Sequence, residues 1–247
     1  VLYVELDSTV YYNPAQVASL NDLRSSIFSA LNLYANNVEI NKFGGRFKYS
    51  KINQLIDRVD DGITSNITKV IIRRDLKALL NQFAQYELCF GNRFNINPAG
   101  YNIKSTGFTL TGSNSIAYLT DVPNKDAAGN LDGSMKGKIS VVSRNNKNQQ
   151  VVLIKDAGVV DYKKGEIILN TINFAATQAD NNIVEVQAYP ESNDIVGLKD
   201  LFVSFNTSNS TINMVKDVIA SGEDVSGVVF TRDYFTSSYS NGVLERK

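Results

Sequence analysis

The sequence contains no histidine and no tryptophan, and its only cysteine is Cys89. Without histidine the chain lacks the commonest general base and the commonest metal ligand. A single cysteine can form neither an internal disulfide nor a cysteine-rich zinc site. A histidine-dependent serine hydrolase triad is therefore excluded within the chain. We expect Cys89 to be a small buried apolar residue of a strand.

The chain also lacks an excess of charge and a long apolar run. Its 25 Lys and Arg residues balance its 25 Asp and Glu residues, so the formal net charge is zero. A neutral chain has no broad positive field of the kind that attracts proteins to nucleic acid. No stretch approaches the roughly 20 consecutive apolar residues of a membrane-spanning helix. We therefore expect neither a nucleic-acid partner nor a membrane partner.

Residues 1–95 combine strand-like and helix-like patterns. Strands are predicted over 1–6, 67–74 and 85–90, where β-branched and aromatic residues dominate or alternate with polar ones. One helix is predicted to begin at Asn13 and Pro14, because asparagine is a good N-cap and proline suits the first helical position. A second helix is predicted from about residue 50. The order strand, helix, helix, strand, strand predicts a small α/β layer domain.

The sequence pattern changes after residue 95. Short strand-like runs alternate with turn signals through residues 96–190, which predicts a β-rich, sandwich-like domain. Residues 191–247 are less regular and predict an irregular C-terminal segment that contacts a partner or a second copy. The expected fold class is α+β, with these three segments in that order.

Aromatic residues gather close to the end of the chain in a context rich in Ser and Asn. They show no clean periodicity, and such residues often need a partner surface to bury them. The candidate interface residues are Phe230, Tyr234, Phe235 and Tyr239.

The stretch NKFGGRFKYSKINQLID (41–57) places two glycines among basic and aromatic residues. A phosphate-binding P-loop needs G-x-x-x-x-G-K-[ST], and a dinucleotide-binding turn needs G-x-G-x-x-G. Neither spacing is present. We interpret Gly44 and Gly45 as a tight turn and Ser50 as the cap of the helix that follows. No cofactor and no small-molecule substrate is predicted.

Two acidic stretches contain residue types that can bind metal ions. Asp57, Asp60 and Asp61 stand beside Gly62, and we interpret them as a solvated helix end. Residues 126–137 contain two Asp and an Asn but lack the closing Glu of a calcium loop. No metal site is predicted.

A small basic patch is formed by Lys69, Arg73 and Arg74 at the end of a predicted strand. Charges on an edge strand discourage aggregation, and we interpret the patch in that way. The first residue, Val1, lies inside the strand-like run VLYVEL, so we expect the chain to be a piece of a longer polypeptide.

One long stretch carries a family resemblance. KFGGRFKYSKINQLIDRVDDGITSNITKVIIRRDL, followed by LNQFAQYELCFGNRF, resembles the baseplate-J-like wedge proteins of contractile-tailed bacteriophages. The resemblance is strongest over residues 38–95 and rests on a turn, a helix ending in ID, the SNIT turn and an arginine-bearing strand in that order. It implies that the chain is the C-terminal part of such a protein.

The resemblance implies a structural role and no catalytic residues. Proteins of this family form dimers, join neighbouring wedges into a ring around the tail hub, and rearrange when the sheath contracts. The implied partners are a second copy and other wedge and tail proteins. The implied location is the virion tail baseplate, after assembly in the host cytoplasm.

Two other function classes remain open from the residues alone. A carbohydrate- or receptor-binding module would suit the Asn- and Tyr-rich middle segment, although the absence of tryptophan counts against it. A hydrolase that uses carboxylates alone would need two close, buried acidic side chains with separated pKa values.

Overall fold

The computed structural model describes residues 1–36, 40–147 and 149–218 and is mostly β. Strands make up 49% and helices 14%. The elements are, in chain order, β1 (Leu2–Tyr12), α1 (Leu20–Ala35), β2 (Lys42–Phe43), β3 (Arg46–Phe47), α2 (Tyr49–Asp57), β4 (Ile63–Lys77), β5 (Phe83–Cys89), β6 (Lys104–Ser105), β7 (Phe108–Leu110), β8 (Ala117–Pro123), β9 (Lys136–Arg144), β10 (Gln150–Asp161), β11 (Glu166–Thr177), the 3₁₀ turn η1 (Asp180–Asn182), β12 (Ile183–Ala188), β13 (Ile195–Val196), β14 (Phe202–Phe205) and β15 (Thr211–Lys216). Neither α-helix is long and apolar enough to cross a membrane.

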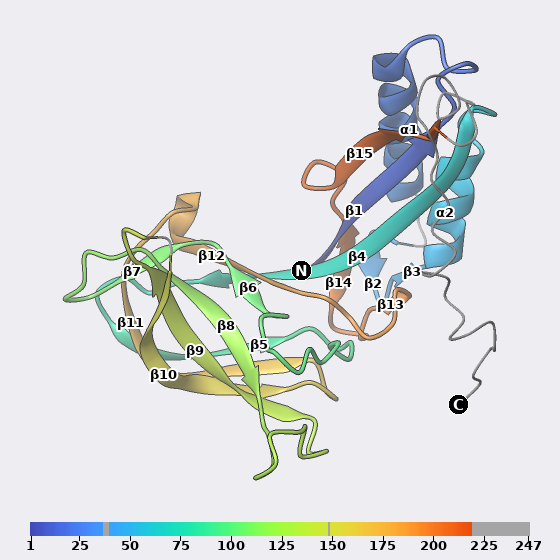
Figure 1. Cartoon of the computed structure of the whole chain (residues 1–247). Coiled ribbons are helices and arrows are strands. Elements are labelled where there is room, and N and C mark those ends of the chain that lie inside the picture. The colour runs from blue at the N-terminus through green and yellow to red at the C-terminus, as the bar shows by residue number, and fades with distance from the viewer. Residues whose placement is uncertain (37–39, 148, 219–247) are drawn as a thin grey trace, which may run out of the picture.

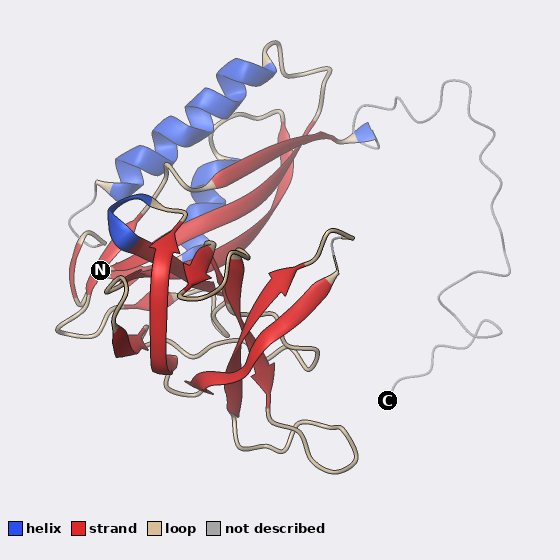
Figure 2. Ribbon diagram, turned by 90° about the vertical axis from the view of Figure 1, so that its left-hand side faces the viewer, coloured by secondary structure: helices blue, strands red, loops and turns tan. Residues whose placement is uncertain are grey.

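The first part of the molecule is a sheet with two helices on one face, which we call the helix lobe (residues 1–71 and 195–216). Its central strand is β1, which pairs antiparallel with β4 on one side and parallel with β14 and β15 on the other. Figure 2 shows both helices on the same side of this sheet. Leu23, Ile27 and Leu31 form the buried stripe of α1, because they recur at helical spacing. The helix lobe is thus built from both ends of the described chain.

The second part is a closed barrel of five strands, β7 to β11. Strand β8 pairs with β7 and β9, β10 pairs with β9 and β11, and β11 returns to β7. Figure 1 shows it beside the helix lobe. On β8, Ala117, Leu119 and Asp121 are buried, whereas Val122 is 48% exposed. Successive side chains of a strand point to opposite faces, so the first three lie inside the barrel.

A buried hydroxyl and carboxylate pair fixes one end of the barrel. The hydroxyl of Tyr162 donates to Asp121 Oδ2 at 2.7 Å, and the amide of Ile103 donates to Oδ1 at 2.7 Å. Burial, together with the negative charge of Asp121, raises the pKa of the Tyr162 hydroxyl above its ordinary value. The hydroxyl therefore stays protonated and remains a donor to the carboxylate.

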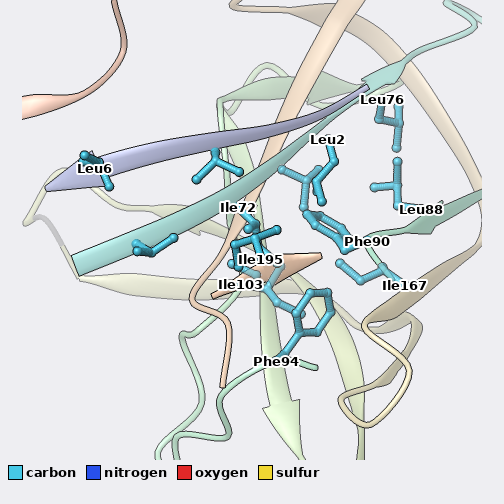
Figure 3. Packing of buried hydrophobic residues seen from close by; sticks show 14 of the residues in the cluster. Leu2, Leu6, Ile72, Leu76, Leu88, Phe90, Phe94, Ile103, Ile167 and Ile195 are labelled. Atoms are coloured by element: carbon cyan, nitrogen blue, oxygen red, sulfur yellow. The ribbon is translucent and has the colours of Figure 1, made fainter. Parts of the chain in front are cut away.

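One long strand joins the two parts. The first residues of β4 pair with β1, and its last residues, Ile72 to Lys77, pair with β12. Strand β12 pairs with β6, and β6 pairs with β8 of the barrel. A single cluster of buried apolar side chains includes Leu2 of the helix lobe and Ile72 of β4 as well as Phe90 and Ile167 (Figure 3). The sheet and the core are therefore continuous from one part to the other.

The expected α+β fold class was wrong. The first segment is not an α/β layer domain, because the chain is mostly β and its first sheet is completed by strands from beyond residue 200. The β-rich segment contains a closed barrel rather than a sandwich. The segment expected to be irregular contributes β13, β14 and β15 within its described residues. The boundaries 1–95, 96–190 and 191–247 stay a prediction.

The interpretation of Arg73 as an edge charge was also wrong. Arg73 lies opposite Tyr3 of β1 and Gln187 of β12, so it occupies an interior strand and is only 4% exposed. Its Nε donates to Glu5 Oε1 at 2.6 Å, and its Nη1 reaches the carboxylates of Asp75 and Glu185. One guanidinium thus binds carboxylates from β1, β4 and β12.

Glu5 has further partners in this ionic cluster. It is 2% exposed, and its carboxylate accepts hydrogen bonds from Gln187 Nε2 and Asn209 Nδ2. Burial raises the pKa of the Glu5 carboxyl above its ordinary value near 4.5, and the charge of Arg73 opposes that rise. A carboxyl with a raised pKa stabilises the fold most at low pH. That contribution is lost as the pH rises through the pKa of the folded state.

We predict that Arg73→Met lowers the free energy of unfolding by about 3–5 kcal/mol at pH 7, because Glu5 is left buried without its cation. The loss should shrink towards pH 4, where Glu5 takes up a proton. The control is Arg93→Met, whose ion pair with Glu191 joins side chains that are 47% and 50% exposed. That change should cost about 0–1 kcal/mol. Urea unfolding of both variants between pH 4 and 8 measures this, and equal losses would contradict the prediction.

Candidate interaction surfaces

The two glycines of the 41–57 stretch form a turn that packs against a distant part of the chain. Gly44 has φ +65°, a left-handed conformation that glycine adopts at little cost. Its amide donates to the carbonyl of Leu198 at 3.1 Å. The carbonyl of Gly45 accepts from the amide of Gly197 at 2.7 Å, and a Cβ at Gly45 would overlap the carbonyl oxygen of Ile40. The turn holds residues 197–198 in place.

The helix after this turn begins one residue before Ser50. Lys48 occupies the N-cap position and its side chain makes no capping hydrogen bond, while Ser50 is the second residue of α2. The amide of Tyr49 instead donates to Asp194 Oδ1 at 2.8 Å. A carboxylate near a helix N-terminus is favoured by the helix dipole. Asp194, which is remote in sequence, therefore occupies the place where a bound anion would be expected.

The acidic residues of the two stretches make local hydrogen bonds. Asp57 Oδ1 accepts from Asn66 Nδ2, and Asp60 Oδ1 accepts from the amide of Gly62. In the loop 126–137, Asp126 Oδ1 accepts from two backbone amides of its own turn. Within the described part of the chain, no group of three or more His, Cys, Asp or Glu side chains could hold a metal ion.

The four aromatic residues expected at an interface lie outside the described residues: Phe230, Tyr234, Phe235 and Tyr239. Their role stays a prediction. Among the described residues, the most exposed large apolar side chains are Leu33, Phe83 and Phe43, at 76%, 75% and 64%. The ring of Phe43 meets Phe202 edge to face with centroids 5.4 Å apart, next to the glycine turn.

A hollow of about 470 Å³ lies on the outer face of the barrel, and we call it the barrel groove. Its lining includes Tyr101, Lys104, Tyr118, Thr120, Val142 and Arg144. Sequence reasoning missed this site. The alternation of Tyr118 and Thr120 in the run SIAYLTDV was the only signal, since Lys104 and Arg144 are brought there by strand pairing.

Part of the chain matches a known protein family. Residues 1–75 match the family model described as baseplate structural protein gp6, C-terminal domain III. They run from β1 almost to the end of β4 and account for 75 of the 247 residues. No curated protein matches the chain.

The family match supports a phage baseplate protein with a structural role, located in the virion tail baseplate. It suggests a non-enzymatic protein. It does not favour a carbohydrate- or receptor-binding module.

We predict that Gly45→Ala destabilises the protein more than Gly44→Ala. The added methyl at Gly45 meets backbone, and overpacking of this kind costs about 1–3 kcal/mol. At Gly44 nothing lies within 4 Å of the added methyl. The only cost there is that of placing alanine in a left-handed conformation, about 1–2 kcal/mol. Gly44→Asn is a further control, because asparagine tolerates that conformation. Urea unfolding ranks the three variants, and a smaller loss for Gly45→Ala than for Gly44→Ala would refute the steric account.

Proposed function

We propose that the chain is the C-terminal part of the large baseplate wedge protein of a T-even type contractile-tailed phage. In this proposal it is a structural virion protein that associates with itself and joins neighbouring wedges into a ring around the tail hub. It rearranges when the sheath contracts, after assembly in the host cytoplasm. Its partners are a second copy and other wedge and tail proteins.

The observation that carries the proposal is the family match over residues 1–75. The resemblance over residues 38–95 supports the same proposal and extends as far as β5. The histidine-free composition and the lack of a metal-binding cluster in the described residues are compatible with a structural role.

The continuous core gives such a role a physical basis. Arg73 binds carboxylates of three strands at the junction, so the helix lobe and the barrel are fastened by buried interactions rather than by a linker. The exposed side chains of Leu33 and Phe83 offer apolar area for contacts with other proteins. A protein that holds neighbours together needs both a stiff body and free contact area.

The location in the tail is tested by labelling. Gold-conjugated antibodies raised against this chain are applied to purified tails of the phage that encodes it and viewed by negative-stain electron microscopy. We expect label at the baseplate end of each tail, before and after contraction. Label along the sheath or at the head would reject the proposal. Unlabelled tails would also reject it, provided that immunoblotting of the dissociated particles shows that the antibody recognises the chain.

Self-association is tested at the C-terminal aromatics. We predict that replacing Phe235 and Tyr239 together with Ser lowers the self-association constant at least tenfold, since buried aromatic side chains dominate many interfaces. Sedimentation equilibrium over a range of concentrations measures the constant. The control pair is Phe43 and Phe202 changed to Ser, which lie at the glycine turn. Unchanged association of the Phe235/Tyr239 variant would place the contact elsewhere.

A further inference from the structure

Three basic residues of the 41–57 stretch line one hollow. Lys42, Gly44, Arg46 and Lys48 border a space of about 230 Å³ at the glycine turn, which we call the basic hollow. The side chains of Lys42, Arg46 and Lys48 are exposed. Gly44 carries no side chain that could fill the hollow, and no described atom lies within 4 Å of the position where a Cβ would be. The cations are therefore accessible to a ligand.

The residues between the cations anchor the stretch to the helix lobe. Phe47 is 1% exposed and belongs to the apolar core. The carbonyl of Gly45 accepts from the amide of Gly197. Because neighbouring side chains of an extended chain point to opposite sides, burial of Phe47 turns Arg46 and Lys48 outward. The backbone positions of the cations are thus fixed before a ligand binds, and such preorganisation lowers the cost of binding.

None of the three cations has an ion-pair partner in the described part of the chain. The ion pairs found there involve other cations: Arg73, Arg93, Lys138 and Lys164. Asp194 and Asp200 belong to segments that pack against this stretch, but neither lines the hollow or pairs with its cations. A hollow lined by charges of one sign concentrates ions of the opposite sign. The basic hollow therefore favours an anionic ligand.

The backbone amides of the turn are already used. The amide of Gly44 donates to the carbonyl of Leu198 at 3.1 Å, and the amide of Gly45 donates to a carbonyl within the turn at 3.2 Å. The amide of Tyr49, at the start of α2, donates to Asp194. Glycine-rich phosphate sites bind the anion through several free backbone amides, and these three are occupied. The hollow thus offers side-chain cations, which suit several separate carboxylates better than one phosphate.

We propose that the basic hollow binds an acidic segment of a partner protein through at least two carboxylates. The planar guanidinium of Arg46 binds one carboxylate through two parallel hydrogen bonds, and the ammonium groups of Lys42 and Lys48 attract the others. Because all three side chains are exposed, each contact alone is weak, and the affinity comes from several charges acting together. The choice of a protein as the partner rests on the proposed structural function.

The experiment uses the whole chain and three fluorescein-labelled probes. One peptide alternates Glu with Ser, and its matched version alternates Gln with Ser. The third probe is a single-stranded DNA oligonucleotide with as many negative charges as the Glu peptide. Fluorescence anisotropy gives the dissociation constant of each probe at low and at physiological salt. We expect the Glu peptide to bind at least tenfold more tightly than the Gln peptide, more tightly than the oligonucleotide, and more weakly as the salt concentration rises.

Matched charge reversals locate the binding in the hollow. Lys42→Glu combined with Lys48→Glu should weaken binding of the Glu peptide at least tenfold, because like charges then face each other. The control, Lys155→Glu combined with Lys163→Glu, changes the net charge equally at exposed positions of the barrel and should leave binding unchanged at physiological salt. Arg46→Lys keeps the charge but loses the planar fork, so it should weaken binding less than Arg46→Glu does. All five positions are exposed, so the urea midpoints should stay unchanged.

Several outcomes would overturn the inference. They are equal binding of the Glu and Gln peptides, equal losses in the hollow pair and the control pair, tighter binding of the oligonucleotide than of the Glu peptide, or full displacement of that peptide by millimolar inorganic phosphate at constant ionic strength. Failure of peptide binding with antibody label at the baseplate would reject the basic hollow alone. Peptide binding with no label on tails would instead reject the proposed function.

Discussion

The structure depends on one buried guanidinium. Arg73 sits where β4 leaves β1 and reaches β12, and it binds carboxylates from all three strands. Removing any one carboxylate from water is costly, so the cluster is stable only while the cation and its hydrogen-bonding neighbours are in place. Strand β1 belongs to the helix lobe, and β12 is connected to the barrel through β6. The ionic cluster therefore sets how the two parts meet. The apolar core around Leu2 and Ile72 is packed on both sides of this cluster.

Local pattern predicted much of the secondary structure. The strands expected over 1–6, 67–74 and 85–90 correspond to β1, β4 and β5, and the helix expected from about residue 50 corresponds to α2. Alternation and helical spacing are local signals, so they can be found without knowing the fold. The strand pairing could not be found in this way. β1 pairs in parallel with β15, about two hundred residues later, and no local signal records that contact.

For the candidate site residues, too, local sequence signals predicted some features and tertiary contacts decided the others. Gly44 and Gly45 were identified as a turn from composition, but the close approach of Gly45 to Ile40 is visible only in three dimensions. Arg73 was misread because an arginine on an edge strand and one in a buried ion cluster look alike in sequence. The barrel groove was missed because Lys104, Thr120 and Arg144 come together only through the pairing of β6, β8 and β9. Charge and burial decide such sites, and both depend on tertiary neighbours.

The position of β1 between β4 and the C-terminal strands bears on how the protein is made. Ribosomes add about 5–20 residues per second, so the segment carrying β14 and β15 emerges roughly 10–40 s after β1. During that interval the antiparallel pair of β1 and β4 has an unpaired edge on β1, which can accept a strand from a neighbouring nascent chain. Exchange of β14 and β15 between two copies would satisfy the same pairing in both. The order of synthesis therefore leaves a short period in which chains can be intertwined, and this period closes once residue 216 has emerged.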